Sequence, residues 1–190
     1  MNLTESDALI VVDVQNDFCP GGALPVPGGE GVVRVINPLQ MKFQKIYFTR
    51  DWHPQDHCSF SDDPAFTDQC WPVHCVQDSP GAEFHGSLHV PSDAVVISKG
   101  ADPNEEAYSG FQGTSLGQQL QKAGIKRVFI AGLATDYCVR ATVLDAIKLG
   151  FETVLVEDSC RGVNDEGTVR ALSEMRAAGA VFCRGSEVTA

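Results

Sequence analysis

Three residues have the types needed for a cysteine-dependent hydrolytic centre: Cys138, Asp13 and Lys99. Cys138 follows an apolar run and lies where helical spacing begins, so the positive end of a helix dipole would lower the pKa of its thiol. Asp13 and Lys99 each end a strongly apolar run, where charged residues are uncommon. An acid, a lysine and a thiol brought together would form one coupled nucleophile and base set. Taken singly, they would be a buried cysteine, a turn carboxylate and a solvated strand end.

A second group of residues has the types that bind a divalent metal ion. Asp51 and His53 are two positions apart, which in an extended segment places both side chains on one face. A carboxylate and an imidazole suit zinc, iron or manganese, and these ligand types do not choose among the three. A third ligand has to come from elsewhere in the chain, and His57 and His74 are the candidates.

The remaining cysteines and histidines favour structural roles. The seven cysteines lie on segments that read as strands, helices and loops, so we expect reduced thiols in the cytosol and no disulfide framework. A structural zinc site from Cys58, Cys70 and Cys75 beside His74 is an alternative, but the spacings fit no common zinc template. Five further cysteines and histidines have no base or partner ligand placed beside them in the sequence. We interpret them as core or surface residues: Cys19, Cys160, Cys183, His85 and His89.

The segments between these residues alternate strand and helix. Apolar runs predict strands at 8–14, 45–49, 94–99, 127–132, 153–157 and 180–183. Helical spacing predicts helices at 31–43, 114–123, 137–149 and 165–178, with Pro38 expected to kink or split the first. This alternation indicates an α/β fold with a mostly parallel sheet. Because ligands bind outside the carboxyl ends of such strands, the candidate residues should converge on one crevice.

The composition limits the classes of function. The 190 residues suit one domain spanning 1–190, and 43% hydrophobic with 21% charged residues is typical of a globular protein. Acidic residues outnumber Lys and Arg by 25 to 14 without a basic cluster, so we expect no nucleic-acid partner. The apolar run at 8–12 is too short for a signal peptide or a membrane span, so we expect a cytoplasmic protein without membrane association. The Gly- and Pro-rich segment 15–30 and the His-, Trp- and Cys-rich segment 50–91 read as functional loops, and the glycine runs match no phosphate-binding pattern.

Five motifs run in order along nearly the whole chain. They are VDVQNDF at 12–18, DWHP at 51–54, WPVHC at 71–75, YSGF at 108–111 and GLATDYCV at 132–139. Together they resemble the nicotinamidase/pyrazinamidase branch of the isochorismatase-like hydrolases. The combination is specific, although each short motif alone would not be.

The resemblance implies a three-layer α/β/α sandwich around a six-stranded, mostly parallel, Rossmann-like sheet. It implies a catalytic triad of Asp13, Lys99 and Cys138. The backbone N–H groups of Ala134 and Cys138 would form an oxyanion hole, aimed by a cis peptide bond between Leu133 and Ala134.

The resemblance also implies one divalent metal ion held by Asp51, His53 and His74, with His57 as a candidate fourth ligand. Zinc is the first expectation, and iron or manganese are the alternatives. In such enzymes the metal binds the pyridine nitrogen of the substrate and so positions the ring. Four aromatic residues match positions that line the ring pocket in the family: Phe18, Trp71, Tyr108 and Tyr137.

The implied activity is hydrolysis of nicotinamide to nicotinic acid and ammonia through a cysteine thioester, with pyrazinamide as a further substrate and a role in NAD salvage. The partner would be this small molecule, and a homo-oligomer is left open. Alternatives are an amidohydrolase of carbamoyl or ureido compounds, a metal-free isochorismatase, and a non-catalytic metal- or redox-binding protein. The metal-type residues argue against the metal-free enzyme, and Phe18 and Trp71 favour a flat aromatic amide.

Overall fold

The computed structural model describes residues 1–67 and 69–190. Within these residues the strands form one six-stranded sheet in the order β3-β2-β1-β4-β5-β6, and every neighbouring pair is parallel. The order reverses between β1 and β4, which is where open α/β sheets bind ligands. The strands are β1 (Asp7–Val12), β2 (Ile46–Asp51), β3 (Val95–Lys99), β4 (Arg127–Leu133), β5 (Glu152–Arg161) and β6 (Val181–Cys183).

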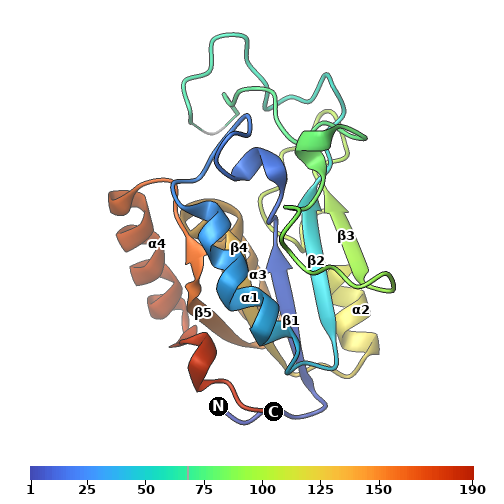
Figure 1. Ribbon diagram of the computed structural model, residues 1–190, viewed down its shortest axis with the longest axis vertical. Coiled ribbons are helices and arrows are strands. Elements are labelled where there is room, and N and C mark those ends of the chain that lie inside the picture. The colour runs from blue at the N-terminus through green and yellow to red at the C-terminus, as the bar shows by residue number, and fades with distance from the viewer. Residues whose placement is uncertain (68) are drawn as a thin grey trace.

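Helices cover both faces of the sheet (Figure 1), and the expected three-layer fold is confirmed. Helix α1 (Val33–Gln40) covers one face. The helices α2 (Leu116–Lys122), α3 (Arg140–Lys148) and α4 (Asp165–Ala178) cover the other. A π-helical turn, η4 (Thr135–Val139), leads from β4 into α3.

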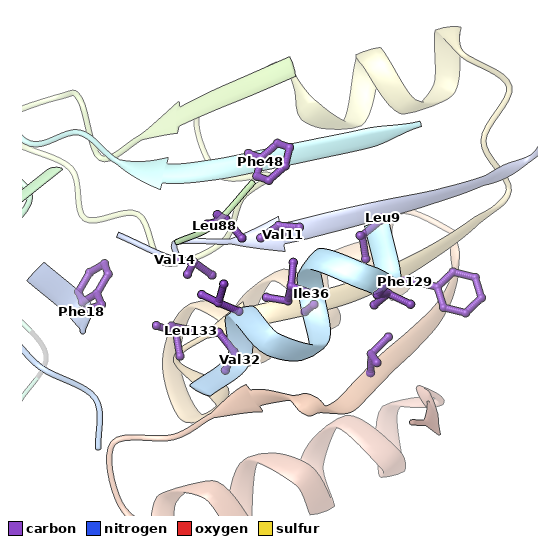
Figure 2. Packing of buried hydrophobic residues seen from close by; sticks show 14 of the residues in the cluster. Leu9, Val11, Val14, Phe18, Val32, Ile36, Phe48, Leu88, Phe129 and Leu133 are labelled. Carbon is purple, nitrogen blue, oxygen red and sulfur yellow. The ribbon is translucent and has the colours of Figure 1, made fainter. Parts of the chain in front are cut away.

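The sheet divides the buried apolar side chains into two cores. All six residues of β1 are buried, and alternate positions face opposite sides because successive side chains of a strand point in opposite directions. Leu9 and Val11 pack with Ile36 of α1, as Figure 2 shows. Ile10 and Val12 pack in the second core with the helices of the other face. Strands buried on both faces explain the continuous apolar runs in the sequence.

Several element bounds differ from the expectation, and for two of them the local cause is clear. The first helix is shorter than 31–43, because a 3-10 turn (Gly29–Val32) precedes α1 and the helix ends at Gln40, two residues after Pro38. Strand β5 is longer than 153–157, because after a register irregularity Cys160 pairs with Gly132 and Arg161 with Leu133. The polar residues at this irregularity interrupt the apolar run, so the sequence pattern ends there although the pairing resumes.

The two ends of the sheet carry different segments. The described residues of the segment 52–82 lie at one end of the molecule, above the carboxyl ends of the strands, and both termini lie at the opposite end (Figure 1). The termini are joined by backbone hydrogen bonds, including Leu3 N–H to the Thr189 carbonyl at 2.9 Å. Among the described residues, no helix is long and apolar enough to cross a membrane.

Candidate active site

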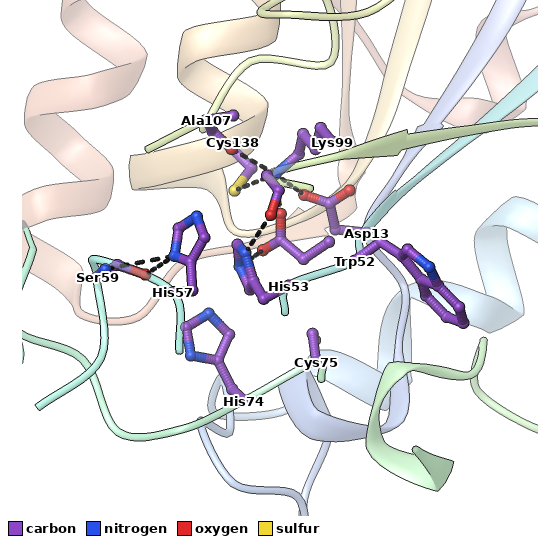
Figure 3. Close-up of polar contacts among 12 residues, drawn as sticks. Asp13, Trp52, His53, His57, Ser59, His74, Cys75, Lys99, Ala107 and Cys138 are labelled. Atoms are coloured by element: carbon purple, nitrogen blue, oxygen red, sulfur yellow. Dashed lines mark hydrogen bonds and ion pairs between the residues drawn. The ribbon is translucent and has the colours of Figure 1, made fainter. Parts of the chain in front are cut away.

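Lys99 is the centre of a buried ion cluster at the carboxyl ends of the strands (Figure 3). Its ammonium pairs with Asp13 Oδ2 at 2.9 Å and with Asp51 Oδ1. It also donates to the Ala107 carbonyl at 3.0 Å and to Cys138 Sγ at 3.5 Å. The side chains of Lys99 and Asp13 are both 0% exposed. The structure therefore brings together the acid, the lysine and the thiol that the sequence singled out.

The turn that carries Cys138 lies against the end of β1 because of a glycine. Gly132 has φ +122°, and a Cβ added there would lie 2.0 Å from the Val12 carbonyl oxygen. This close approach places a carboxylate oxygen of Asp13 within 4.8 Å of Cys138 Sγ. The peptide bond between Leu133 and Ala134 is cis, as the resemblance implies.

Burial sets the resting protonation of this cluster. Burial raises the pKa of Asp13 above its ordinary value, although the charge of Lys99 opposes the shift. Burial would lower the pKa of Lys99, but the carboxylates of Asp13 and Asp51 raise it well above its ordinary value. Burial raises the pKa of the Cys138 thiol well above its ordinary value, against the effect of Lys99. The expectation of a lowered thiol pKa is therefore wrong for this state, and the thiol needs a base to remove its proton.

Asp51, His53 and His74 form a second buried group beside the ion cluster. Each offers a ligand atom within 4.8 Å of those of the other two. His53 Nδ1 lies 2.9 Å from the Gly100 carbonyl and His74 Nδ1 lies 2.7 Å from the Pro72 carbonyl. Because a carbonyl only accepts, both rings donate through Nδ1, so Nε2 is the atom that each ring can offer to a metal ion; that of His53 faces Asp51 Oδ2 at 3.6 Å.

The electrostatics of this second group also suit a cation. Although burial alone would raise the pKa of Asp51, the charge of Lys99 holds it well below its usual range, so the side chain is a carboxylate. Burial lowers the pKa of His74 to about 4, so its imidazole is neutral at neutral pH. One carboxylate and two imidazole nitrogens are ligand types of zinc, iron and manganese sites.

His57 lies next to this group without joining it. Its ring centroid is 4.1 Å from that of His53. However, its Nδ1 lies 2.6 Å from Ser59 Oγ and its Nε2 lies 3.1 Å from the Glu105 carbonyl, so both nitrogens have other partners. Among the described residues, the groups with metal-type spacing contain neither His57 nor the cysteines considered for a structural zinc site. All seven cysteines are free, as expected.

An apolar cavity opens beside the thiol. Phe18, Trp71, Tyr108 and Tyr137, the four predicted ring-pocket residues, all line it. The Trp71 indole N–H donates to the Tyr108 hydroxyl at 2.9 Å, and the rings of Trp71 and Tyr137 meet edge to face. The wall is completed by residues of both candidate groups and of the loops: Asp51, His74, Cys138, Ala134, Leu24, Val26, Glu106 and Val163.

Comparison with known proteins places the chain in a family. The model of the isochorismatase domain matches residues 7–187. The chain belongs to the isochorismatase family. It is 43% identical to the nicotinamidase of Escherichia coli (strain K12), over 92% of this chain and 93% of the relative. It is also 43% identical to the nicotinamidase/pyrazinamidase of Mycobacterium tuberculosis (strain ATCC 25618 / H37Rv), over 90% of this chain and 95% of the relative.

A solved structure agrees with these relatives. The pyrazinamidase of Pyrococcus horikoshii in complex with zinc superposes with a TM-score of 0.88 at 50% identity, covering 94% of this chain and 99% of that one. The isochorismatase fold is thus common to the chain and to a zinc-bound relative.

Within this isochorismatase-family chain, some residues at the site were not found from the sequence. The Thr49 hydroxyl donates to Asp13 Oδ1 at 2.5 Å and so orients that carboxylate. Leu24 and Val26 lie in the loop segment 15–30 that the composition had marked as functional. Glu106 and Val163 line the cavity, but neither lies in a motif or at a strand end that would have drawn attention.

Proposed function

We propose that this chain is a nicotinamidase, an amidohydrolase that converts nicotinamide to nicotinic acid and ammonia and also accepts pyrazinamide. The observation that carries the proposal is a single cavity lined by the Cys138 thiol, by two residues of the metal-type group and by four aromatic rings. Such a cavity suits a flat aromatic amide whose ring nitrogen and carboxamide are recognised at the same time. The names of the similar proteins support the same activity.

The first chemical step is assigned to the ion cluster. Asp13 accepts the thiol proton of Cys138, and the thiolate sulfur attacks the carboxamide carbon. Lys99, whose ammonium lies 3.5 Å from Cys138 Sγ, stabilises the thiolate as it forms. Thr49 holds the Asp13 carboxylate in place through its other oxygen.

The next steps release ammonia and restore the thiol. Ala134 and Cys138 both line the cavity, and we propose that their backbone N–H groups donate to the oxyanion. Asp13 then gives its proton to the departing nitrogen as the C–N bond breaks, leaving ammonia and a thioester. A water molecule, losing a proton to Asp13, attacks the thioester carbon; nicotinic acid leaves and the sulfur recovers its proton.

We assign Asp51, His53 and His74 as the residues that hold a divalent metal ion. The fit rests on two rings whose Nδ1 atoms contact backbone carbonyls, so that Nε2 is the ligand atom of each, and on a carboxylate kept ionised by Lys99. When bound, the ion would accept the lone pair of the pyridine nitrogen and so fix the ring in the cavity. Zinc is the proposed ion, with iron and manganese as alternatives, and the zinc complex of the Pyrococcus relative supports this choice.

The product suggests the cellular role. Nicotinic acid is a pyridine carboxylate from which NAD can be rebuilt, so we place the reaction in NAD salvage in the cytoplasm. The proposed substrate is a free small molecule, which a mostly apolar cavity beside the thiol suits.

A panel of amides tests the proposal. Ammonia release would be measured with nicotinamide, pyrazinamide, benzamide and an N-carbamoyl amino acid. We expect nicotinamide and pyrazinamide to give the highest kcat/KM and benzamide, which lacks the ring nitrogen, to show a raised KM. A preference for the carbamoyl compound by folded, metal-loaded protein would overturn the proposal in favour of a ureido amidohydrolase.

A further inference from the structure

Gln15 is a fully buried polar residue that the reaction scheme does not use. Its side chain is 0% exposed and lies in the loop that follows β1. Its Nε2 donates to the Asp51 carbonyl at 2.8 Å, and its Oε1 accepts from the Asp51 N–H at 2.7 Å. One side-chain amide therefore holds both backbone polar groups of a single residue.

The position of Asp51 explains why this amide is needed. Strand β1 pairs with β2 as far as Val12 and Thr49, and the Asp13 N–H still donates to the Thr49 carbonyl at 3.2 Å. Asp13 then takes φ +47° and the chain turns away from β2. Because strand residues two apart present their backbone groups to the same side, Asp51 would face β1 without a backbone partner. The Gln15 amide takes the place of the missing strand.

The same amide also fixes the long loop above the site. Nε2 donates a second hydrogen bond, to the Ala82 carbonyl at 2.9 Å. The backbone of Gln15 forms an antiparallel bridge with Phe84. Gln15 therefore joins the loop after β1, the end of β2 and the segment 80–84. A buried amide with all these partners is costly to replace, because each lost partner leaves a desolvated polar group.

The backbone of Asp51 has to be held in a fixed position because its carboxylate contacts two side chains, Lys99 and His53, at the same time. Oδ1 pairs with Lys99, and Oδ2 lies 3.6 Å from His53 Nε2. On the other side of β2, the Trp52 N–H donates to the Lys99 carbonyl at 3.0 Å, so β3 holds that side of the strand end. A small rotation of the Asp51 backbone would separate its carboxylate from one of the two groups.

We propose that Gln15 is a positioning residue for the metal group, acting through the backbone of Asp51. This inference rests on the proposed role of Asp51 as a metal ligand. Loss of the amide hydrogen bonds would let the end of β2 move, so the carboxylate would no longer lie where Lys99 and the two imidazoles both need it. Metal binding should weaken although no ligand atom has been removed.

Gln15→Met tests this, because an unbranched apolar side chain keeps the approximate volume and removes all three hydrogen bonds. Metal affinity would be measured by competition with a chromophoric chelator, using zinc alone. We expect the zinc Kd to rise about 10- to 100-fold, the effect typical of residues that orient a ligand. The KM for nicotinamide should rise more than kcat falls. Gln15→Glu keeps the acceptor for the Asp51 N–H but sets a carboxylate oxygen against the Asp51 and Ala82 carbonyls, so it is also expected to weaken zinc binding.

Gln40 offers a matched control in α1. It is also buried, and its Nε2 donates to the His89 carbonyl at 2.9 Å and to Asn37 Oδ1 at 3.2 Å, away from the site. Gln40→Met removes two part-buried hydrogen bonds of another buried side-chain amide, so it should lower Tm while leaving the zinc Kd and KM as in the wild type. A general loss of stability is thereby separated from a loss of positioning.

The outcomes separate this inference from the proposed function. A wild-type zinc Kd in Gln15→Met, with Asp51→Ala unable to bind zinc, would overturn the inference and leave the metal site standing. Zinc retained by Asp51→Ala would overturn both. An equal weakening in Gln40→Met would also overturn the inference, because the effect would then be general. If Gln15→Met does not fold, the zinc Kd of Gln15→Glu decides: a wild-type value contradicts the inference.

Discussion

Each end of the sheet has an aspartate bound to a buried or half-buried cation, and the two arrangements differ. At the amino ends of the strands, Arg127 donates to both carboxylate oxygens of Asp7, at 2.8 and 2.7 Å. The Thr4 N–H adds a further hydrogen bond at 2.6 Å. At the carboxyl ends, Lys99 is shared by Asp13 and Asp51 and also reaches the Cys138 thiol.

The difference lies in how the charges are matched. The amino-end pair joins one carboxylate, Asp7, to one guanidinium that donates to both of its oxygens. These hydrogen bonds lower the pKa of Asp7 and so stabilise the folded state at neutral pH. The carboxyl-end cluster has two carboxylates for one cation and therefore one excess negative charge when both are ionised. That excess leaves Asp51 able to bind a second cation and Asp13 able to accept a proton. We assign the first end to stability of the fold and the second to the proposed chemistry.

The largest expected effect comes from removing the thiol. Cys138→Ala should reduce turnover of nicotinamide by more than about 10⁴-fold, as removal of a nucleophile does in other hydrolases. Circular dichroism and bound zinc should stay as in the wild type. Cys183→Ala, a change of another buried cysteine, is the control and should keep its turnover. Appreciable ammonia release by Cys138→Ala would remove it as the nucleophile.

The two cations should differ in their importance for stability. Lys99→Met leaves two buried carboxylates without a cation and should cost about 3–5 kcal/mol of unfolding free energy in addition to activity. Arg127→Met should cost less, because the Arg127 side chain is 23% exposed and water replaces part of its interaction. Urea unfolding of both variants measures this. Equal losses would mean that the two ends are energetically alike.

The two aspartates should differ in metal binding. Asp51→Ala removes a proposed ligand, so zinc affinity should fall by more than the about 10- to 100-fold expected for a supporting residue, and KM should rise steeply. Asp7→Ala, at the other end of the sheet, should keep the wild-type zinc Kd. Chelator competition on both proteins gives the comparison, and zinc retained by Asp51→Ala would exclude its ligand role.

The smallest effect is the pH dependence of the amino-end pair. Burial alone would raise the pKa of Asp7, but the hydrogen bonds from Arg127 and Thr4 lower it below its ordinary value of 3.8. Its stabilisation is therefore complete above the unfolded-state pKa and is lost as the pH falls through the lower folded-state pKa. Asp7→Asn should cost about 1 kcal/mol at neutral pH and less below about pH 3.9, with turnover unchanged. A stability difference that does not shrink in acid would contradict this pairing.

The sequence predicted well which charged and thiol residues gather at the carboxyl ends of the strands, and the reason is physical. Strands buried on both faces, such as β1, are continuous apolar runs, so a charged residue such as Asp13 at the end of that run is conspicuous. The parallel alternation then implies that such ends share one edge of the sheet. The four strands that carry the candidate residues are indeed neighbours, in the order β3-β2-β1-β4.

Contacts between distant segments were harder to predict. The hydrogen bonds between the Gln15 amide and the Asp51 backbone form because β1 leaves the sheet before β2 does. No local sequence pattern shows where one strand ends relative to its neighbour. The spacing of His57 allowed it as a ligand, and only the fold shows its ring held by Ser59 and the Glu105 carbonyl. The raised thiol pKa of Cys138 follows from its burial in the folded chain, which outweighs the opposing charge of Lys99.

The most direct test is ammonia release from nicotinamide by the purified protein before chelation, after chelation and after zinc is restored, with Cys138→Ala treated in the same way. Turnover should fall on chelation, return with zinc and be absent throughout in Cys138→Ala. Folded, zinc-loaded protein that releases no ammonia from nicotinamide would contradict the account, as would turnover that does not need Cys138.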